Sequence, residues 1–169
     1  MRTLLFVLAL SAPLALHAQN ATTCLRALHG SWRGPGTVLG RAIVMEQEWG
    51  LAVGDAFTQL SMRHLAADSS TRASFQGLGL YRASGDSVRG NWHDSRGIAF
   101  AVDGRCAGGT FISSWSGVER GRTVYERRGD SLFVIDSVYP AAGAGREFGR
   151  SVLVRGAGTR DPFGDPRRP

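Results

Sequence analysis

The stretch His93-Asp94-Ser95 contains the three residue types of a serine-hydrolase triad. The residues are consecutive, however, and neighbouring side chains of a strand point to opposite faces of a sheet. A triad needs groups that converge within hydrogen-bonding distance. Asp94 and Ser95 precede Gly97, and side chains of these types stabilise turns by bonding to nearby backbone. The stretch therefore predicts a turn, and we expect no catalytic residue in it.

His64 is a second candidate, because it shares one face of a predicted strand with Leu60 and Met62. A partly buried imidazole can bind a ligand or transfer a proton near neutral pH. It can equally be a hydrogen-bonded residue at the rim of the fold. Glu46 and Glu48 also share a strand face, as paired carboxylates would, but the opposite face is apolar. We therefore expect both glutamates outside, facing arginines.

The sequence predicts no metal ion, cofactor or nucleic acid as a partner. Cys24 and Cys106 lie far from any other Cys or His at zinc-ligand spacing. Gly34-Pro35-Gly36 is followed by another predicted strand, whereas a phosphate-binding loop opens a helix. The 20 basic residues, all Arg, outnumber the 14 acidic ones and give a formal net charge of +6. They are scattered rather than concentrated, so we interpret them as a solvated mixed-charge surface.

Aromatic residues are the stronger candidates for a binding site. They are distributed over different predicted strands, and a closed barrel would bring its inward-facing members together. The same side chains would also suit a filled core without a cavity, and the sequence leaves both alternatives open. Met62 and His64, which share a face of predicted strand 56–65, complete the set. The candidate ligand-binding residues are Trp49, Met62, His64, Phe75, Trp92, Phe111, Trp115, Tyr125 and Tyr139.

The elements that must position these residues are mostly short strands. The 169 residues include 23 Gly and 43% hydrophobic residues, which favours one globular domain and disfavours a helical bundle, a disordered chain or a multi-span membrane protein. The hydrophobic period is two, with turn signals such as Ser84-Gly85-Asp86 and Asp103-Gly104 between the runs. The predicted strands are 31–39, 42–49, 56–65, 74–82, 87–94, 98–102, 105–115, 123–128, 131–139 and 147–155.

These strands are joined in sequence by tight turns, without a helix long enough for a crossover. A sheet of this size normally closes or splits, and the sequential order favours closure. Residues 22–29 carry Cys24 and two leucines at helical spacing and end at Gly30, which predicts a short helix. The expected fold class is all-β: an antiparallel up-and-down barrel of about ten strands with a short N-terminal helix. Strands 74–82 and 131–139 are apolar on both faces, so the pattern does not orient them.

Residues 1–18 have the layout of a secretory signal peptide. Met1-Arg2-Thr3 is positively charged, an apolar run follows, and Ala18 supplies a small residue at the cleavage site. The apolar run is shorter than the roughly 20 residues that a membrane span needs. We therefore expect export to the periplasm or exterior, a single barrel domain over 19–156, and a flexible tail over 157–169, where Pro and Arg are frequent.

The two cysteines are candidates for a disulfide in an oxidising compartment. The alternative is a pair of buried free thiols. A Cys24–Cys106 bridge would tie the N-terminal segment to the seventh predicted strand. In the chain-entropy model, closing a loop of about 80 residues contributes roughly 4 kcal/mol.

Gly30-Ser31-Trp32-Arg33-Gly34 resembles the opening of calycin-type barrels, in which a Gly-x-Trp sits at the barrel floor. The segments 77–81 and 88–97 look like those of a family of exported bacterial domains of unknown function, related in fold to nitrobindin-like barrels. The resemblance covers about residues 25–155. It implies that Trp32 is buried at the floor beneath an arginine of the last strand, either Arg155 or Arg150. Nitrobindin relatives hold haem through a late histidine, and no His follows His93 here, so no haem is expected.

From these features we expect an exported barrel that binds a small, largely apolar molecule without catalysis. One alternative is an enzyme, a hydrolase or isomerase, that uses His64 and a carboxylate in the same cavity. Another is a structural or interaction module with a filled barrel. A convergent histidine and carboxylate inside the barrel would favour the enzyme.

Overall fold

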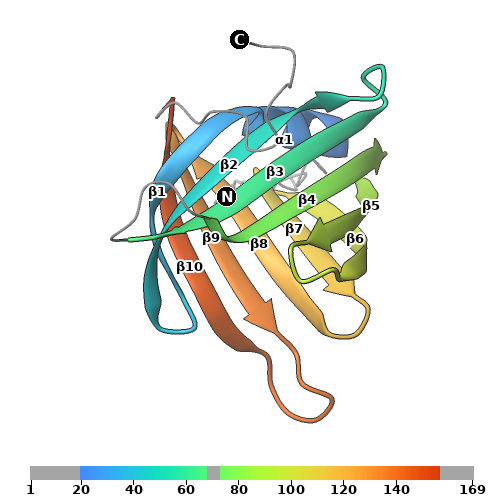
Figure 1. The fold of residues 1–169 in the computed structure, drawn as a ribbon. Coiled ribbons are helices and arrows are strands. Elements are labelled where there is room, and N and C mark those ends of the chain that lie inside the picture. The colour runs from blue at the N-terminus through green and yellow to red at the C-terminus, as the bar shows by residue number, and fades with distance from the viewer. Residues whose placement is uncertain (1–19, 68–72, 157–169) are drawn as a thin grey trace, which may run out of the picture.

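The computed structural model describes residues 20–67 and 73–156, and the predicted signal peptide and C-terminal tail lie outside the described residues. Its antiparallel strands form a closed barrel in the order β1-β10-β9-β8-β7-β6-β5-β4-β3-β2, as Figure 1 shows. This confirms the predicted fold class. The elements are α1 (Ala21–Leu28), β1 (Gly30–Val38), β2 (Arg41–Ala52), β3 (Phe57–Ala66), β4 (Ala73–Ser84), β5 (Ser87–Asp94), β6 (Ala99–Ala107), β7 (Thr110–Ser116), β8 (Arg120–Arg128), β9 (Ser131–Val138) and β10 (Arg146–Arg155).

The predicted boundary between the sixth and seventh strands is wrong. Asp103-Gly104 lies within β6, and the turn into β7 is made by Gly108 and Gly109, with φ of 56° and 81°. Positive φ favours glycine, which explains the turn. Gly104 serves packing instead, since a Cβ there would lie 2.6 Å from the ring of Phe111. The Asp103-Gly104 pair was therefore misinterpreted as a hairpin turn, although it lies in the middle of a strand.

The barrel has two different ends. We call the end beside α1 the helix end, and the opposite end, with the β1–β2 and β9–β10 hairpins, the far end (Figure 1). The backbone N–H of Ala21 donates to the carbonyl of Gly85, which places α1 against the β4–β5 hairpin. Ala21, Cys24, Leu25 and Leu28 are all buried on the barrel side of the helix. Within residues 20–67 and 73–156, no helix has the length and apolar composition needed to cross a bilayer.

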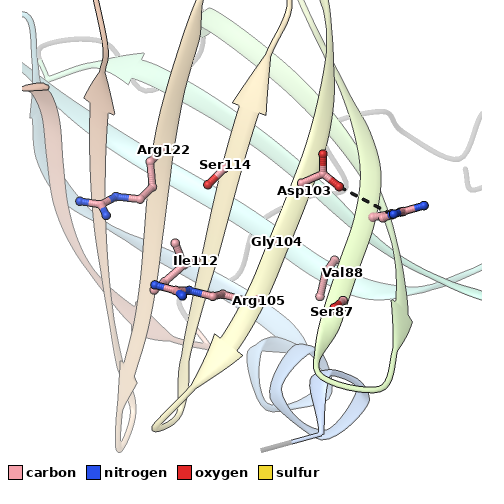
Figure 2. Close-up of a pocket in the computed structure, with 9 residues that line it drawn as sticks. Ser87, Val88, Asp103, Gly104, Arg105, Ile112, Ser114 and Arg122 are labelled. Atoms are coloured by element: carbon pink, nitrogen blue, oxygen red, sulfur yellow. Dashed lines mark ion pairs between the residues drawn. The ribbon is translucent and has the colours of Figure 1, made fainter. Parts of the chain in front are cut away.

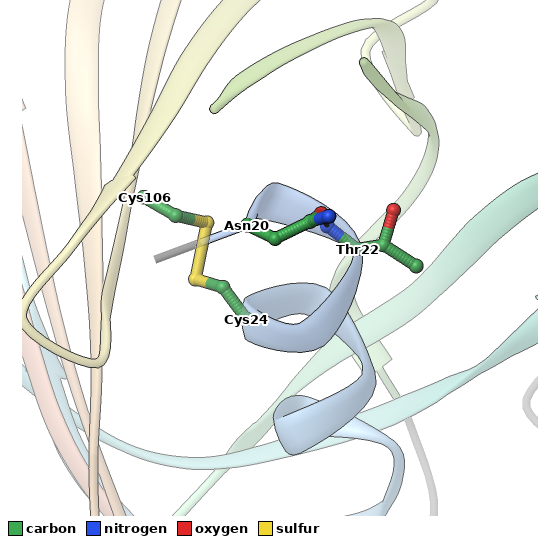
Figure 3. Close-up of a disulfide and its surroundings, with 4 residues drawn as sticks. All are labelled: Asn20, Thr22, Cys24 and Cys106. Atoms are coloured by element: carbon green, nitrogen blue, oxygen red, sulfur yellow. Dashed lines mark hydrogen bonds between the residues drawn. A yellow bond between two sulfur atoms is a disulfide. The ribbon is translucent and has the colours of Figure 1, made fainter. Parts of the chain in front are cut away.

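The structure contains the predicted disulfide between Cys24 and Cys106 (Figure 3), with 6.2 Å between the two Cα atoms. Cys106 lies on β6, the sixth strand, rather than on the seventh, because the strand boundary differs from the predicted one. At the start of the helix, the Asn20 side chain accepts a hydrogen bond from the Thr22 backbone N–H at 2.9 Å. The N-cap therefore stabilises the first turn of α1, and the disulfide holds the helix on the barrel.

Trp32 is fully buried beneath α1. Its indole Nε1 donates to the carbonyl of Leu28 at 2.7 Å, and the guanidinium of Arg155 lies 4.3 Å from the ring centroid. The same guanidinium donates to the carbonyl of His29 at 2.6 Å. Arg150, the other candidate, instead pairs with Glu147 at 2.8 Å in solvent. The floor of the barrel is thus built from β1, β10 and α1 together.

An aromatic cluster fills the interior beside the helix end. Trp49 stacks on Tyr81 with 5.8 Å between ring centroids, and Phe111 stacks on Tyr125 at 5.7 Å. Trp49 and Tyr125 meet edge to face at 5.0 Å. All four side chains are buried and belong to the hydrophobic core. We refer to these four residues as the aromatic core.

Candidate binding site

Along several strands, the first inward-facing residue beyond the hydrophobic core, toward the far end, is polar. Residues two apart on a strand share a face, so the residue two positions beyond a core residue also faces inward. By this alternation Asp136 follows the core residue Val134 on β9, and His64 follows Met62 on β3. We define the interior polar layer as the five polar residues found this way beyond the last core residue of their strands: His64, Ser113, Thr123, Asp136 and Ser151. Gln47 also faces inward, but it lies between the core residues Met45 and Trp49.

Asp136 is held by a short chain of hydrogen bonds. Thr123, its direct partner across β8 and β9, donates its hydroxyl to Asp136 Oδ1 at 2.7 Å. The indole Nε1 of Trp115 donates in turn to Thr123 Oγ1 at 3.3 Å. The second oxygen, Oδ2, lies beside Gly149 of β10, where a Cβ would be 3.2 Å away. One carboxylate oxygen is therefore occupied, and the other faces a residue without a side chain.

Burial raises the pKa of Asp136 to about 6, and the negative charge of Glu147 adds to this rise, while the hydrogen bond from Thr123 opposes it. The carboxyl is therefore mostly ionised at pH 7. Among the ion pairs of the described residues, none includes Asp136. An acid without a counter-charge thus lies in the far half of the barrel.

Two other members of the polar layer have atoms without partners. His64 is 8% exposed and Ser151 is 2% exposed, and neither His64 Nε2 nor Ser151 Oγ has a hydrogen-bond partner among the described residues. Burial lowers the pKa of His64 to about 4, so its imidazole is neutral at pH 7, and it stacks on Phe75 at 5.0 Å. A buried polar atom without a partner costs about 1–3 kcal/mol. His29 Nε2 and Arg155 Nε also lack hydrogen-bond partners, but they lie at the helix end, where other Arg155 nitrogens bond to carbonyls and Arg155 Nε lies 4.0 Å from Asp130 Oδ1.

Three aromatic side chains accompany the polar layer and are only partly buried: Phe75, Trp92 and Trp115. Both indoles lie over glycines on a neighbouring strand. A Cβ at Gly77 would be 1.9 Å from Trp92, and one at Gly121 would be 2.1 Å from Trp115. These glycines let the indoles lie close to the barrel wall. The far half therefore offers apolar ring surface beside hydrogen-bonding atoms.

The structure divides the predicted ligand-binding residues into three groups. Trp49, Phe111 and Tyr125 belong to the closely packed aromatic core, with Met62 buried beside them in the same hydrophobic cluster. His64, Phe75, Trp92 and Trp115 surround the polar layer. Tyr139 follows the end of β9, and its ring lies 5.9 Å from the guanidinium of Arg122 on the outer face.

Tyr139 is therefore a correction to the predicted interior set. It has the opposite strand parity to Asp136, so it faces away from the interior.

Asp136, Thr123, Ser113 and Ser151 were not among the residues predicted from the sequence. The available signal was the spacing of Asp136 from Leu132 and Val134, all on one face. That signal was ambiguous because Phe133 and Ile135 make the other face of β9 apolar as well. Around Ser151, buried and exposed residues alternate regularly along β10. Even so, Ser151 could be assigned to the interior only once the structure showed which face of the strand points inward.

The other candidates from the sequence lie on the outer face or in the β5–β6 turn at the far end. His93 is exposed. Asp94 accepts from the Arg96 backbone N–H at 2.9 Å, and Ser95 Oγ accepts from the Gln76 backbone N–H at 3.1 Å, which makes the predicted turn. Glu46 lies between two arginines on the outer face, with Arg33 Nε at 2.8 Å and Arg63 on the other side. No hydrolase triad is assembled from these residues.

A convergent histidine and carboxylate is also missing from the described interior. His64 on β3 and Asp136 on β9 are separated around the barrel by β2, β1 and β10, and no hydrogen bond joins them. Among residues 20–67 and 73–156, no group of three metal-ligating side chains gathers. The described residues thus support binding through single polar contacts better than acid–base chemistry through a dyad.

The outer face carries a groove of about 430 Å³ across β5 to β8, drawn in Figure 2. Arg89 and Asp103 face each other there at 3.7 Å, and both are largely exposed. A second groove of about 510 Å³ adjoins it and shares Ser87 and Arg89. Exposed ion pairs of this kind contribute little. The groove is lined by Ser87, Val88, Arg89, Asp103, Gly104, Arg105, Ile112, Ser114 and Arg122.

Neither a scan against protein-family models nor a search of curated proteins finds a match for this chain. Solved structures do share its fold. Rv2717c from M. tuberculosis superposes with a TM-score of 0.64 at 18% identity, covering 78% of this chain and 96% of that one. The S-type phycobiliprotein lyase CPES from Guillardia theta superposes with a TM-score of 0.58 at 9% identity, covering 83% and 95%. Both fit a calycin-like barrel.

Proposed function

We propose that this protein is an exported barrel that binds a small, largely apolar molecule in the far half of its interior. One observation carries the proposal: partly exposed aromatic rings stand beside buried polar atoms that have no protein partner. Ligand sites in proteins combine apolar walls with a few placed polar groups in the same way. The aromatic core beside the helix end would then be the closed bottom of the site.

The energetics of the polar layer support a ligand over a purely structural interior. Leaving Ser151 Oγ and His64 Nε2 without partners costs folding free energy, and an apolar residue at either position would avoid that cost. A ligand that bonds to these atoms would recover it. The Guillardia neighbour is titled a lyase, so barrels of this shape are not confined to structural roles.

Export is the second part of the proposal, and it rests on the leader pattern of residues 1–18 and on the disulfide. Intact-mass analysis of protein secreted by a bacterial host tests it. We expect the mass of a chain that begins at Gln19, after cleavage behind Ala18. Secreted protein that retains Met1 would contradict the signal peptide.

Binding is tested by titration with the uncharged fluorescent probe N-phenylnaphthylamine. Ser113 and Ser114 are neighbours on β7, but Ser113 is buried in the polar layer and Ser114 lines the outer groove. We expect Ser113→Leu to weaken probe binding by about tenfold or more, because the added side chain fills the interior. Ser114→Leu should leave it unchanged. Circular dichroism and thermal melts establish that both variants fold.

The two serines also separate the alternatives. Loss of binding only in Ser114→Leu would place the ligand in the outer groove and contradict the interior site. No binding in the wild-type protein, together with no small molecule in native mass spectra of protein from its own host, would favour a filled interaction module. Ser151→Val serves as a second interior variant in case Ser113→Leu does not fold.

A further inference from the structure

The charge of the interior is opposite to that of the whole chain. The formal net charge is +6, and the basic residues face solvent or close the helix end. In the polar layer the one carboxylate is Asp136, and the layer's histidine, His64 on β3, is neutral because burial lowers its pKa. Asp94 at the far end is already paired with Arg96 at 2.8 Å. The far half of the described interior therefore carries one uncompensated negative charge.

That charge is held in a fixed position. The hydrogen bond from Thr123 orients the carboxylate, and Trp115 in turn holds the Thr123 hydroxyl. Oδ2 lies beside Gly149, which has no side chain of its own, and the neighbouring side chain at this position is the apolar Val38. A carboxylate in a water-poor interior loses hydration, so it gains most from a ligand that supplies both positive charge and a hydrogen-bond donor.

We propose that the ligand of this barrel is a cationic amphiphile, an apolar molecule whose protonated amine pairs with Asp136. This rests on the proposed interior site and names the chemical class that fills it. The rings of Trp92 and Trp115 provide the apolar surface for the rest of the molecule. The pairing is charge-assisted, which makes it about twice as strong as a bond between neutral groups.

Ser151 supplies a second acceptor for the same group. It pairs across the sheet with Val134, which places it diagonally next to Asp136, and side chains in that relation lie within about 7–8 Å. Its hydroxyl has no partner and is buried. An ammonium has three donors, so it can bond to Asp136 and Ser151 together. A neutral alcohol has one donor and no charge.

The same arrangement disfavours fatty acids and other anionic amphiphiles. A carboxylate ligand beside Asp136 would place two negative charges in the interior, without a cation from the described residues to separate them. The net charge of +6 opposes a cation at long range, but physiological salt screens charges beyond about 8 Å. Selection therefore depends on the local charge at Asp136.

A matched ligand series tests the proposal. Decylamine, 1-decanol and decanoate have the same chain and differ in their head group. Each is used to displace N-phenylnaphthylamine from the full-length mature protein at pH 7.5. We expect decylamine to displace the probe at a concentration about tenfold lower than decanol, and decanoate to be the weakest.

The variant Asp136→Asn assigns the preference to this residue. The amide keeps the shape and an acceptor for Thr123 but removes the charge, so the advantage of decylamine over decanol should fall to about twofold or less. Decanol should bind as before. Asp103→Asn, on the exposed outer face, is the control and should retain the full advantage. If Asp136→Asn does not fold, Thr123→Val, which removes the orienting bond, should reduce the same ratio.

Acidification supplies a second readout. The amine preference should disappear as the pH falls through about 6, where Asp136 takes up its proton. The groups facing Asp136 do not titrate in this window: Glu147 is paired with Arg150, which lowers its pKa, and burial raises the pKa of both Tyr81 and Tyr125.

The outcomes separate this proposal from the proposed function. Equal displacement by decylamine and decanol, or tighter binding of decanoate, would overturn the amine while leaving an apolar site in place. A preference that persists in Asp136→Asn would overturn the assignment to this residue. Failure of the probe and all three ligands to bind would reject the interior site itself, and the amine proposal with it.

Discussion

The two ends of the barrel are built by different means. At the helix end, a disulfide ties α1 to β6, and the indole of Trp32 and the guanidinium of Arg155 tie α1 to β1 and β10. In the far half, the partly buried carboxylate of Asp136 has no counter-charge among the described residues, and the buried hydroxyl of Ser151 has no hydrogen-bond partner. Unpartnered atoms alone do not distinguish the ends, because Arg155 Nε is also unpartnered. What distinguishes the far half from the helix end is the uncompensated negative charge of Asp136.

This difference separates stability from function within one sheet. The helix end contributes favourable packing and a covalent bond, whereas the far half costs folding free energy through buried polar groups. Proteins commonly accept such a cost at sites that act on a ligand. Variants at the helix end should therefore lower stability and leave ligand selection unchanged, whereas variants in the polar layer should change ligand selection without lowering stability.

The largest effect is expected for Trp32→Ala. Removing a fully buried indole should lower the free energy of unfolding by about 3–5 kcal/mol, measured by urea denaturation. Binding of N-phenylnaphthylamine to the folded fraction should be unchanged, because Trp32 lies beneath α1 at the other end. Strong iodide quenching of Trp32, measured in variants that retain only this tryptophan, would contradict its burial.

Loss of the disulfide should follow. The double variant Cys24→Ser, Cys106→Ser opens a loop with a sequence separation of 82 residues. We expect the free energy of unfolding to fall by about 2–4 kcal/mol, because the unfolded chain is no longer constrained. Reducing agent should destabilise the wild type by a similar amount and have no effect on the double variant. A change in the decylamine preference would show that the two ends are coupled.

Asp136 should make the far half sensitive to pH. Its pKa is raised to about 6, so the protonated form stabilises the fold, and this stability is lost as the pH rises from about 4 through about 6. The expected loss is roughly 2–3 kcal/mol for a rise of about two pKa units. Asp136→Asn should remove this pH dependence and be more stable than the wild type at pH 7.5.

The control for this prediction is Asp103→Asn, since the Asp103 carboxylate is 80% exposed. It should keep the wild-type dependence between pH 4 and 7. Identical stability profiles for wild type and Asp136→Asn, recorded by denaturation across this range, would show that the pKa of Asp136 is not raised in the folded protein.

Arg155→Ala tests the coupling within the helix end. A cation–π contact contributes about 0.5–2 kcal/mol, and the variant also loses the bond to the carbonyl of His29, so we expect a cost of about 1–2 kcal/mol. In a double-mutant cycle with Trp32→Ala, the two costs should not add. If the two stability costs add fully, the contribution of the Arg155 guanidinium to stability does not depend on its contact with the Trp32 indole. Arg150→Ala, on the exposed outer face, should cost less.

The fold could be predicted from the sequence because strand alternation and glycine-rich turns are local signals. The period of two around Trp92 and the turn at Ser84-Gly85-Asp86 both correspond to the structure. The boundary near Gly104 could not be read this way, since a glycine that makes room for Phe111 looks like a glycine in a turn. The number of cysteines also supplied the Cys24–Cys106 pair, because two cysteines allow only one bridge within the chain.

The polar layer was hidden for a different reason. Its residues lie on different strands, and their common position depends on strand register around the closed barrel. Thr123 and Asp136 meet because β8 and β9 place them opposite each other, and a slip of either strand by one residue would turn its member of the pair to the outer face. The types of these residues alone did not indicate that they lie together in the barrel. The aromatic residues were easier to identify, yet their division between the core and the layer also depended on register.

Ser151→Ala should have the smallest effect on stability and a measurable effect on ligand choice. The hydroxyl has no partner in the described structure, so its removal relieves a desolvation cost, and the free energy of unfolding should stay the same or rise by up to about 1 kcal/mol. The space it occupies lies over Gly36, where a Cβ would be 1.9 Å from the Ser151 Oγ, so the alanine leaves a small gap that limits the gain.

In the same variant, decylamine should bind about threefold to tenfold more weakly, because the ammonium loses one acceptor while Asp136 remains. Decanol and N-phenylnaphthylamine should be nearly unaffected. A loss of packing alone would lower the affinity of all three ligands equally. The ratio of decylamine to decanol affinity therefore distinguishes a lost hydrogen bond from lost packing. A ratio equal to that of the wild type, measured by probe displacement at pH 7.5, would show that Ser151 does not contact the amine and would leave Asp136 as its partner.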